Sequence, residues 1–157
     1  MRSILITGYS GYIGSNLWEY FKYDTHYQTN GIDFPIDLSM MTDLPDVDYV
    51  IHLAASTGVR ESIERPQEYF DNNVISTKNI FNRYGCSNTK ILFASTSAVK
   101  ELASPYAMSK YACELIAPWN CVIMRFFTVY GGINYRKNML YGLAKDETDL
   151  NSKDKIS

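Results

Sequence analysis

The stretch SILITGYSGYIG, residues 3–14, decides the fold that this sequence predicts. A short apolar run, typical of a buried strand, leads into three glycines spaced Gly-x-x-Gly-x-x-Gly, and a helical pattern follows. The first glycine of such a loop permits a tight turn, the second lets the backbone approach a pyrophosphate, and the third lets the helix pack against the strand. The free N–H groups at the start of the helix also attract phosphate. The predicted phosphate contacts are Gly8, Gly11, Tyr12, Ile13 and Gly14, with a plain structural turn as the alternative.

Short apolar runs alternate with helical stretches along the rest of the chain. The expected strands are residues 3–7, 27–33, 49–54, 90–95 and 121–127, and the expected helices are residues 12–23, 67–84, 106–117 and 138–145. Strands that are apolar throughout are typical of a parallel sheet covered on both faces. We therefore predict an α/β fold, a Rossmann-type doubly wound parallel sheet of order 3-2-1-4-5-6 in three α/β/α layers. Residues 1–145 are expected to form one dinucleotide-binding domain, and residues 146–157 a polar, disordered tail.

A carboxylate, Asp33, ends the second expected strand, 19 residues after Gly14. In this position it can hydrogen-bond the ribose hydroxyls of a dinucleotide, and it would repel a 2′-phosphate. The sequence therefore favours NAD over NADP as the cofactor. The alternative is that Asp33 is only a turn residue before Pro35.

Tyr106 and Lys110 are spaced so that they share one face of an expected helix, which begins after Pro105. A neighbouring ammonium favours the phenolate, and a phenolate can take a proton from a sugar or alcohol hydroxyl. The pair is therefore a candidate general base, with an amphipathic surface pair as the alternative.

Ser95, Thr96 and Ser97 lie at the end of an expected strand, where a hydroxyl could bond the substrate oxygen that loses its proton. The alternative is a polar exit from the strand. His52 sits inside an apolar strand, which favours a hydrogen-bonded core residue over a catalytic base.

Composition excludes several classes of partner. The 157 residues carry a formal net charge of -2 without a basic run, so neither nucleic acid nor an acidic membrane surface is expected as a partner. No apolar run is long enough to span a bilayer. The three cysteines follow no metal-binding spacing, so we expect no metal site and reduced thiols in a cytoplasmic protein.

These motifs, taken in order, resemble the extended short-chain dehydrogenase/reductase family, which includes NAD-dependent epimerases and dehydratases of nucleotide sugars. The resemblance extends to about Met139 and implies that Thr96, Tyr106 and Lys110 are catalytic. The further residues that it places at the cofactor are Asp37, Leu38, Leu53, Ala54, Ala55, Thr57, Asn73, Ser95, Phe127 and Val129, beside Tyr106 and Lys110. It places Ser97, Thr128 and Arg136 at the substrate.

Two segments resemble one branch of this family, the uronate-type 4-epimerases. They are GVRESIERP at residues 58–66 and RFFTVYG at residues 125–131, in which Thr128 is a candidate contact for position 6 of the sugar. The resemblance implies an NAD-dependent nucleotide-sugar 4-epimerase for a UDP-hexose or UDP-hexuronate, acting through a transient 4-keto sugar. A sugar dehydratase is disfavoured because Ser97-Ala98 stands where that enzyme would carry an acidic pair.

Other features of the sequence depart from the family. Lys100-Glu101 replaces its usual Tyr-Gly, and residues 132–157 are too few for its second, substrate-binding lobe. A catalytically silent or partner-dependent NAD- or nucleotide-binding module is therefore the alternative function, beside a sugar dehydratase or reductase of the same family. Apolar positions between Ile133 and Leu143 could instead form the interface of a homo-oligomer.

Overall fold

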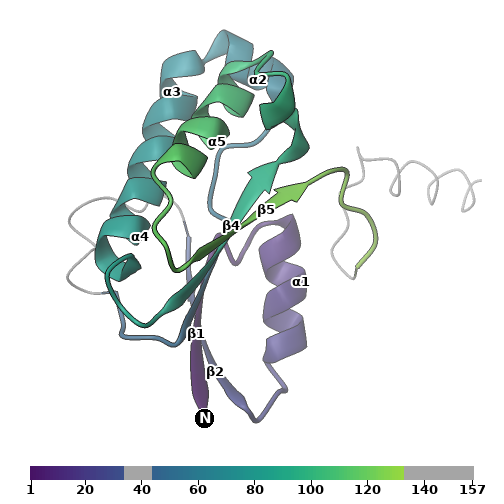
Figure 1. Cartoon of the computed structure of the whole chain (residues 1–157). Coiled ribbons are helices and arrows are strands. Elements are labelled where there is room, and N and C mark those ends of the chain that lie inside the picture. Colours follow the sequence, from purple (N-terminus) through teal and green to yellow (C-terminus); the bar gives the residue numbers. More distant parts are fainter. Residues whose placement is uncertain (34–43, 133–157) are drawn as a thin grey trace, which may run out of the picture. The chain divides into compact units, whose positions relative to one another are not determined.

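The computed structural model describes residues 1–33 and 44–132 and divides the chain into two units, Met1–Phe127 and Thr128–Ser157. The first unit is built on a parallel sheet (Figure 1). Its strands are β1 (Arg2–Thr7), β2 (Tyr27–Ile32), β3 (Tyr49–His52), β4 (Lys90–Thr96) and β5 (Cys121–Phe126). Every paired neighbour runs parallel, in the order β2-β1-β3-β4-β5. The predicted α/β fold with a parallel sheet is confirmed.

The predicted six-strand order is wrong in detail. The observed order equals 2-1-4-5-6 of the prediction, so the strand expected beyond β2 is absent from the described residues. That strand would have to lie between Ile32 and Tyr49, where residues 44–48 form none and residues 34–43 lie outside the described part. The connection is short, and a parallel strand with its crossover needs a dozen or more residues on each side.

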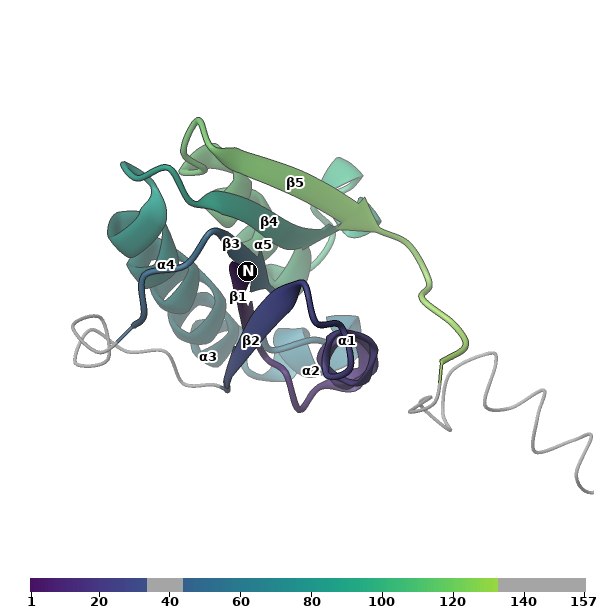
Figure 2. The same cartoon turned by 90° about the horizontal axis from the view of Figure 1, so that it is seen from below.

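Helices cover both faces of this sheet, as the three-layer prediction requires (Figure 2). On one face lies α1 (Tyr12–Phe21). On the other lie α3 (Pro66–Phe70), the π-helical turn η2 (Asp71–Ile75), α4 (Ser76–Tyr84) and α5 (Pro105–Leu115). The predicted helix at residues 67–84 is therefore one helical stretch that contains a π turn. The predicted helix at 138–145 and the tail at 146–157 lie outside the described residues.

Two short elements were not predicted from the sequence. They are α2 (Val59–Glu64) and the 3-10 turn η3 (Ser97–Lys100). Each is too short to show a helical period in the sequence. Both follow the carboxyl end of a strand, so they help to build the edge at which the site lies.

Each face of the sheet has its own hydrophobic core. Side chains of β1, β3 and β4 pack on α4 and α5 through Leu5, Val50, Ile80, Phe93 and Cys113 among others. The opposite face is smaller, and there Ile4, Ile6 and Ile51 pack on aromatic and aliphatic side chains of α1. The two cores together fix the positions of the strands, and with them the positions of the strand ends. In the described part of the chain, no helix is long and apolar enough to cross a membrane.

Candidate active site at the carboxyl edge of the sheet

The predicted site residues gather where the parallel strands end. Gly8 follows β1, Asp33 follows β2, Leu53 follows β3 and Thr96 closes β4. Because all the strands run parallel, these positions share one edge of the sheet. The chain proceeds from β1 outward to β2 and then returns to β3 on the other side of β1. Ligands of such folds bind at this switch point, which here lies between the loops after β1 and β3.

The glycine loop makes a tight turn for which two of its glycines are required. Gly8 has a φ of +70°, and an added Cβ would lie 2.8 Å from the Ala54 nitrogen. An added Cβ on Gly14 would lie only 2.1 Å from the Gly8 carbonyl oxygen. Gly11, by contrast, would meet only that oxygen, at 3.2 Å. The loop therefore packs against itself and β3 through Gly8 and Gly14, and it leaves space beside Gly11.

The start of α1 has the features of a phosphate site. Its N-cap is Gly11, no side chain caps the helix, and its first turn holds no acidic residue. The first amides of a helix without such a cap can bind an anion, and the helix dipole favours negative charge there. The backbone therefore fits the pyrophosphate of a dinucleotide.

Asp33 lies beside this loop. Its carboxylate oxygen Oδ1 accepts a hydrogen bond from the Ser10 amide at 3.2 Å. The bond ties the end of β2 to the glycine loop, so a carboxylate stands next to the phosphate site. This is where the sequence placed an acid for the ribose of NAD.

His52 is a core residue, as predicted. It is fully buried, and its Nδ1 and Nε2 lie 2.6 Å from Thr7 Oγ1 and 3.0 Å from Thr77 Oγ1. Thr7 Oγ1 already accepts bonds from the amides of Leu53 and Ala54, so its own proton must go to Nδ1 of His52. The proton of the ring is therefore on Nε2. Burial, and then the charge of Lys110, lower the pKa of His52 to about 3, which keeps the ring neutral.

The Asn73 side chain is hydrogen-bonded to the backbone of the loop after β3. Its side chain is fully buried in the π turn; Oδ1 accepts from the Ser56 amide at 2.7 Å, and Nδ2 donates to the Ser56 carbonyl at 3.1 Å. Nδ2 also donates to Ser109 Oγ on α5 at 3.0 Å. π turns are frequent at functional sites. Here the turn joins the loop after β3 to the helix that bears Tyr106 and Lys110.

Thr96 and Tyr106 lie on elements that pack together. Thr96 ends β4 and caps η3, with its Oγ1 accepting from the Ala98 amide at 3.3 Å. Tyr106 lies in the first turn of α5, which packs against β4 and against η3, where Ser97 lies. Its partly exposed ring meets the Tyr69 ring edge-on, and the Tyr69 hydroxyl donates to the Thr57 carbonyl at 2.7 Å. The Thr96 hydroxyl accepts a bond in η3, so its proton is left for an oxygen of a ligand.

Lys110 lies in the interior, 3% exposed, with its ammonium 4.4 Å from the centre of the Phe93 ring. Burial lowers the pKa of Lys110 to about 8, although Cys113 and Glu114 raise it in part. Such a cation in a dry environment acts strongly on groups close to it. The surface-pair alternative for Tyr106 and Lys110 is therefore excluded for the lysine.

Ser95 is buried too, and its hydroxyl is bonded to Glu114, a residue that was not predicted from the sequence. Its hydroxyl donates to Glu114 Oε1 at 2.5 Å, and the same carboxylate receives a forked pair of bonds from Arg125. The available signal was the spacing, because Glu114 lies four residues after Lys110 and so on the same helix face. Direct contact of Ser95 with a ligand, as predicted, is not what this geometry favours.

Several predicted residues are not among those that gather at this edge. Asp37, Leu38 and Arg136 lie outside the described residues, and Thr128 and Val129 belong to the second unit. Phe127 ends the first unit with its ring 76% exposed. Their parts in the site stay predictions, as does that of Ala55 in the loop after β3.

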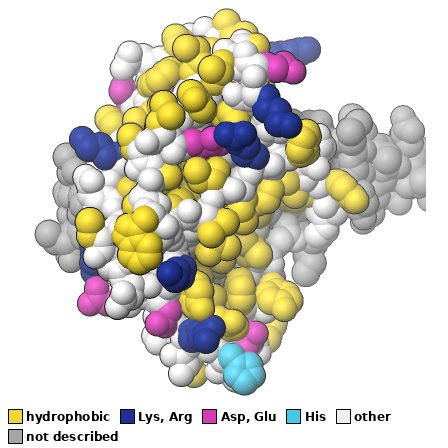
Figure 3. All heavy atoms as spheres, viewed as in Figure 1, with side chains coloured by type: hydrophobic (Ala, Val, Ile, Leu, Met, Phe, Trp, Pro, Cys, Tyr) yellow, Lys and Arg dark blue, Asp and Glu magenta, His cyan; other side chains and the backbone are white. Residues whose placement is uncertain are grey.

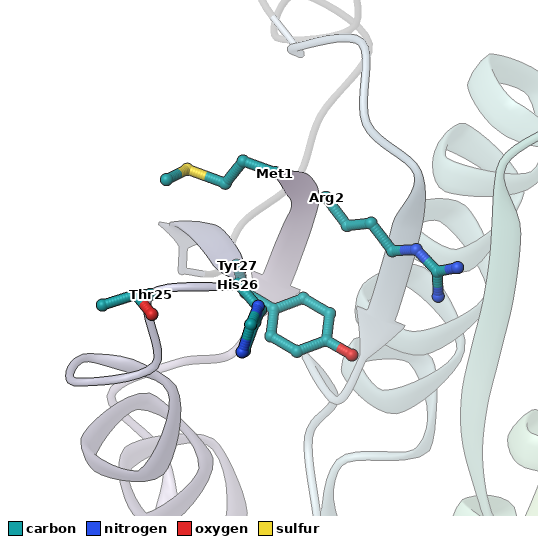
Figure 4. A pocket seen from close by; sticks show the side chains of 5 residues that line it. All are labelled: Met1, Arg2, Thr25, His26 and Tyr27. Carbon is teal, nitrogen blue, oxygen red and sulfur yellow. The ribbon is translucent and has the colours of Figure 1, made fainter.

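A surface hollow of about 560 Å³ lies at the opposite edge of the sheet (Figure 4). Its lining is Met1, Arg2, Thr25, His26 and Tyr27, which surround the first residues of β1 and β2. It is therefore separate from the candidate site. Within residues 1–33 and 44–132, no three metal-binding side chains cluster.

The chain matches the model of the NAD dependent epimerase/dehydratase family over residues 4–143. It belongs to this family. The UDP-glucose 4-epimerase of Mycoplasma genitalium is 36% identical over 117 residues, which cover 57% of this chain and 33% of the relative. A probable UDP-glucuronate 4-epimerase of Rhizobium meliloti is 32% identical over 118 residues, covering 60% and 34%. The expected likeness to nucleotide-sugar epimerases is confirmed.

A solved structure of MoeE5 in complex with UDP-glucose and NAD superposes with a TM-score of 0.75 at 26% identity. The match covers 90% of this chain and 59% of that one. The matched segments span about a third of the length of these two epimerase relatives. The match to the family model, over residues 4–143, includes the glycine loop, Tyr106 and Lys110.

Hydrophobic side chains are also exposed on the face that Figure 3 shows. Around the end of α5 and the edge strand β5, the exposed large hydrophobic residues are Leu115, Ile116, Trp119, Val122 and Ile123. The expected homo-oligomer stays a prediction.

Proposed function

We propose that this chain carries the NAD site and the catalytic residues of a nucleotide-sugar 4-epimerase. The observation that carries the proposal is the arrangement of the edge. A glycine loop with an uncapped helix start lies beside Asp33, while the packed elements β4, η3 and α5 carry Thr96, Tyr106 and Lys110. A protein that only held a dinucleotide would not need this hydroxyl, phenol and buried lysine.

The loop fits the cofactor in its backbone. The amides at the start of α1 would hold the pyrophosphate, and the space beside Gly11 lets that backbone approach it. Asp33 would bond the adenosine ribose, and Leu53, Ala54 and Thr57 would border the ring systems. When bound, NAD supplies the hydride chemistry of the reaction, which no side chain can provide.

The residues of α5 and β4 supply the proton transfer. Tyr106, as phenolate, takes the proton of the sugar 4-hydroxyl, and the Thr96 hydroxyl donates to the same oxygen. Lys110, one turn after Tyr106 on the same helix, favours the phenolate through its buried positive charge. With bound NAD supplying the hydride chemistry at carbon 4, loss of the proton and of the hydride would give a 4-keto sugar. That sugar would turn over, and return of the hydride to its other face, with the proton returned by Tyr106, would invert carbon 4.

A UDP-hexuronate is the substrate that we favour, with a UDP-hexose as the alternative. The GVRESIERP segment, residues 58–66, contains α2, which follows the loop after β3. The first residue of the segment, Gly58, precedes the helix and has a φ of +118°. The relative from Rhizobium meliloti, a probable UDP-glucuronate 4-epimerase, supports the first choice, and MoeE5, which binds UDP-glucose, supports the second. Thr128, Ser97 and Arg136 are the proposed sugar contacts.

Sugar NMR on the full chain tests this function. The protein is mixed with NAD and UDP-glucuronate, and in a second tube with UDP-glucose, and the sugar signals are followed over hours. We expect the 4-epimer to appear in one tube, and Tyr106→Phe to slow its formation about 10²- to 10⁴-fold because the base is lost. Tyr111→Phe, which removes a phenol elsewhere on the same helix, is the control and should keep the wild-type rate.

NAD binding is measured on the same samples by calorimetry. Binding without conversion of either sugar would contradict the epimerase and support the NAD-binding module instead. Conversion that Tyr106→Phe leaves unchanged would contradict the assignment of the base.

A further inference from the structure

The strongest unassigned cluster lies just behind the proposed catalytic residues. Glu114, near the end of α5, has its side chain only 5% exposed and is bonded from two strands. From β4, the Ser95 hydroxyl donates to Oε1 at 2.5 Å. From β5, Arg125 Nε donates to Oε1 at 3.0 Å, and its Nη2 donates to Oε2 at 2.5 Å.

Glu114 and its two partners each lie close in the sequence to a residue of the proposed site. Ser95 directly precedes Thr96, Arg125 precedes Phe127 by two positions, and Glu114 follows Lys110 by one helical turn. One carboxylate therefore joins the three elements β4, β5 and α5. The bonds are charge-assisted, and bidentate arginine–carboxylate geometry is among the strongest and most directional in proteins.

The two charged side chains of this ion pair are not equally buried. The carboxylate is inside the protein, while the Arg125 side chain is 45% exposed. Glu114, one helical turn after Lys110, raises the pKa of that lysine against the lowering effect of burial. A buried carboxylate one turn away stabilises an ammonium.

We infer that Glu114 is a positioning residue of the active site. Its buried carboxylate holds α5, and with it Tyr106 and Lys110, against the ends of β4 and β5, and it keeps a negative charge beside the lysine. The catalytic part of this inference rests on the proposed function. The electrostatic part does not, so it can be tested without any turnover.

The test is a titration of Lys110 by NMR of its side-chain carbon Cε in the full chain, assigned with a Lys110→Arg variant. The titratable groups whose charges interact with that of Lys110 are His52 from β3 and Cys113 and Glu114 on its own helix. Tyr106 lies one turn before it on α5, and Arg125 from β5 is the ion-pair partner of Glu114. His52 is neutral over the pH range of this titration, and burial raises the pKa of Cys113. Glu114 and Arg125 are therefore the groups to change.

Two variants should move the titration in opposite directions. Glu114→Gln keeps the shape of the side chain but removes the negative charge, so the midpoint of Lys110 should fall by about one pH unit. Arg125→Gln removes the opposing positive charge, so the midpoint should rise. Glu19→Gln on α1, which loses the same charge on the other face of the sheet and is paired with Lys22 at the surface, should leave the midpoint unchanged.

A midpoint that stays at its wild-type value in both variants would overturn the inference, whether or not the chain proves to be an epimerase. If Glu114→Gln does not fold, Arg125→Gln decides alone, and a fall or no change in its midpoint counts against the inference. Where turnover is measurable, the pH profile of kcat in Glu114→Gln should shift together with the Lys110 midpoint. A lower kcat with an unshifted profile would show a structural role only and would also overturn it.

Discussion

Lys110 is the residue at which function and stability conflict most clearly. The fold buries an ammonium on the face of Phe93, and Cys113 and Glu114 offset part of the loss of hydration. Keeping a buried cation costs free energy of unfolding, because the unfolded chain hydrates it fully. That cost makes sense only if the charge serves the site, as the proposed support of the Tyr106 phenolate does.

Lys110→Met should therefore raise stability while it abolishes turnover. The folded pKa of about 8 lies below the usual 10.5, so we expect the variant to be more stable at pH 7 by about 1–3 kcal/mol. Above pH 8 the folded wild type loses the proton that its unfolded chain retains, so wild-type stability rises and the difference should close towards pH 10. Urea unfolding at pH 7, 8.5 and 10 measures this. A less stable variant, or a gap that does not depend on pH, would contradict the buried charge.

At the scale of elements, two glycines of the loop between β1 and α1 have different roles, one in packing and one at the predicted ligand. Gly14 allows the helix to approach the strand, while Gly11 leaves space on the side of the predicted pyrophosphate. The same spacing in the sequence thus contains one position that serves packing and one that serves the ligand. Only the distances of a built Cβ tell them apart.

Gly14→Ala and Gly11→Ala should consequently fail in different ways. The Cβ at position 14 would lie 2.1 Å from a backbone oxygen, so α1 must shift, and we expect a loss of about 3 kcal/mol or more in unfolding free energy. At position 11 the nearest atom is 3.2 Å away, so stability should change by less than about 1 kcal/mol while NAD affinity falls about tenfold or more. Thermal unfolding and NAD calorimetry on both variants provide the comparison. Equal losses of stability would refute this division.

The whole molecule is held together by buried polar bonds as well as by its cores. Thr7 of β1, His52 of β3 and Thr77 of α4 form one hydrogen-bonded chain through the middle of the fold. The chain needs a neutral imidazole, because Nδ1 must accept the Thr7 proton. Acid should therefore act on the global unfolding of the protein through His52.

We expect unfolding to become easier as the pH falls from 7 to 5. The folded pKa of about 3 lies below the unfolded value of 6.5, so the unfolded state takes up the proton first, and stability present above pH 6.5 is lost below it. This group alone should cost about 2 kcal/mol between pH 7 and 5. His52→Gln should be less stable at pH 7 but should lack this slope, as urea unfolding of both proteins at the two pH values can show. An identical slope in the variant would exclude His52 as the cause.

The sequence by itself determined the class of the fold, the edge of the site and the family. Apolar strands alternating with helices predict a parallel sheet, and glycine spacing, Asp33 and the Tyr106–Lys110 interval are local patterns that short-range geometry explains. These patterns are also found in the structure, because a turn, a helix face and a strand end each depend on residues that are close together in the chain. The short elements α2 and η3 were missed because they hold too few residues for a period.

The tertiary structure alone decided what lies beneath these motifs. That Ser95 and Arg125 meet at Glu114, that Asn73 braces the loop after β3, and that the His52 proton is on Nε2 depend on residues far apart in the chain. The strand order also belongs here, because it was the structure that showed β2 at the edge of the described sheet, where the sequence had predicted a further strand. Long-range pairing of buried polar groups leaves no periodic signal in a sequence, since each group needs only one partner and that partner can come from any element that the fold brings near.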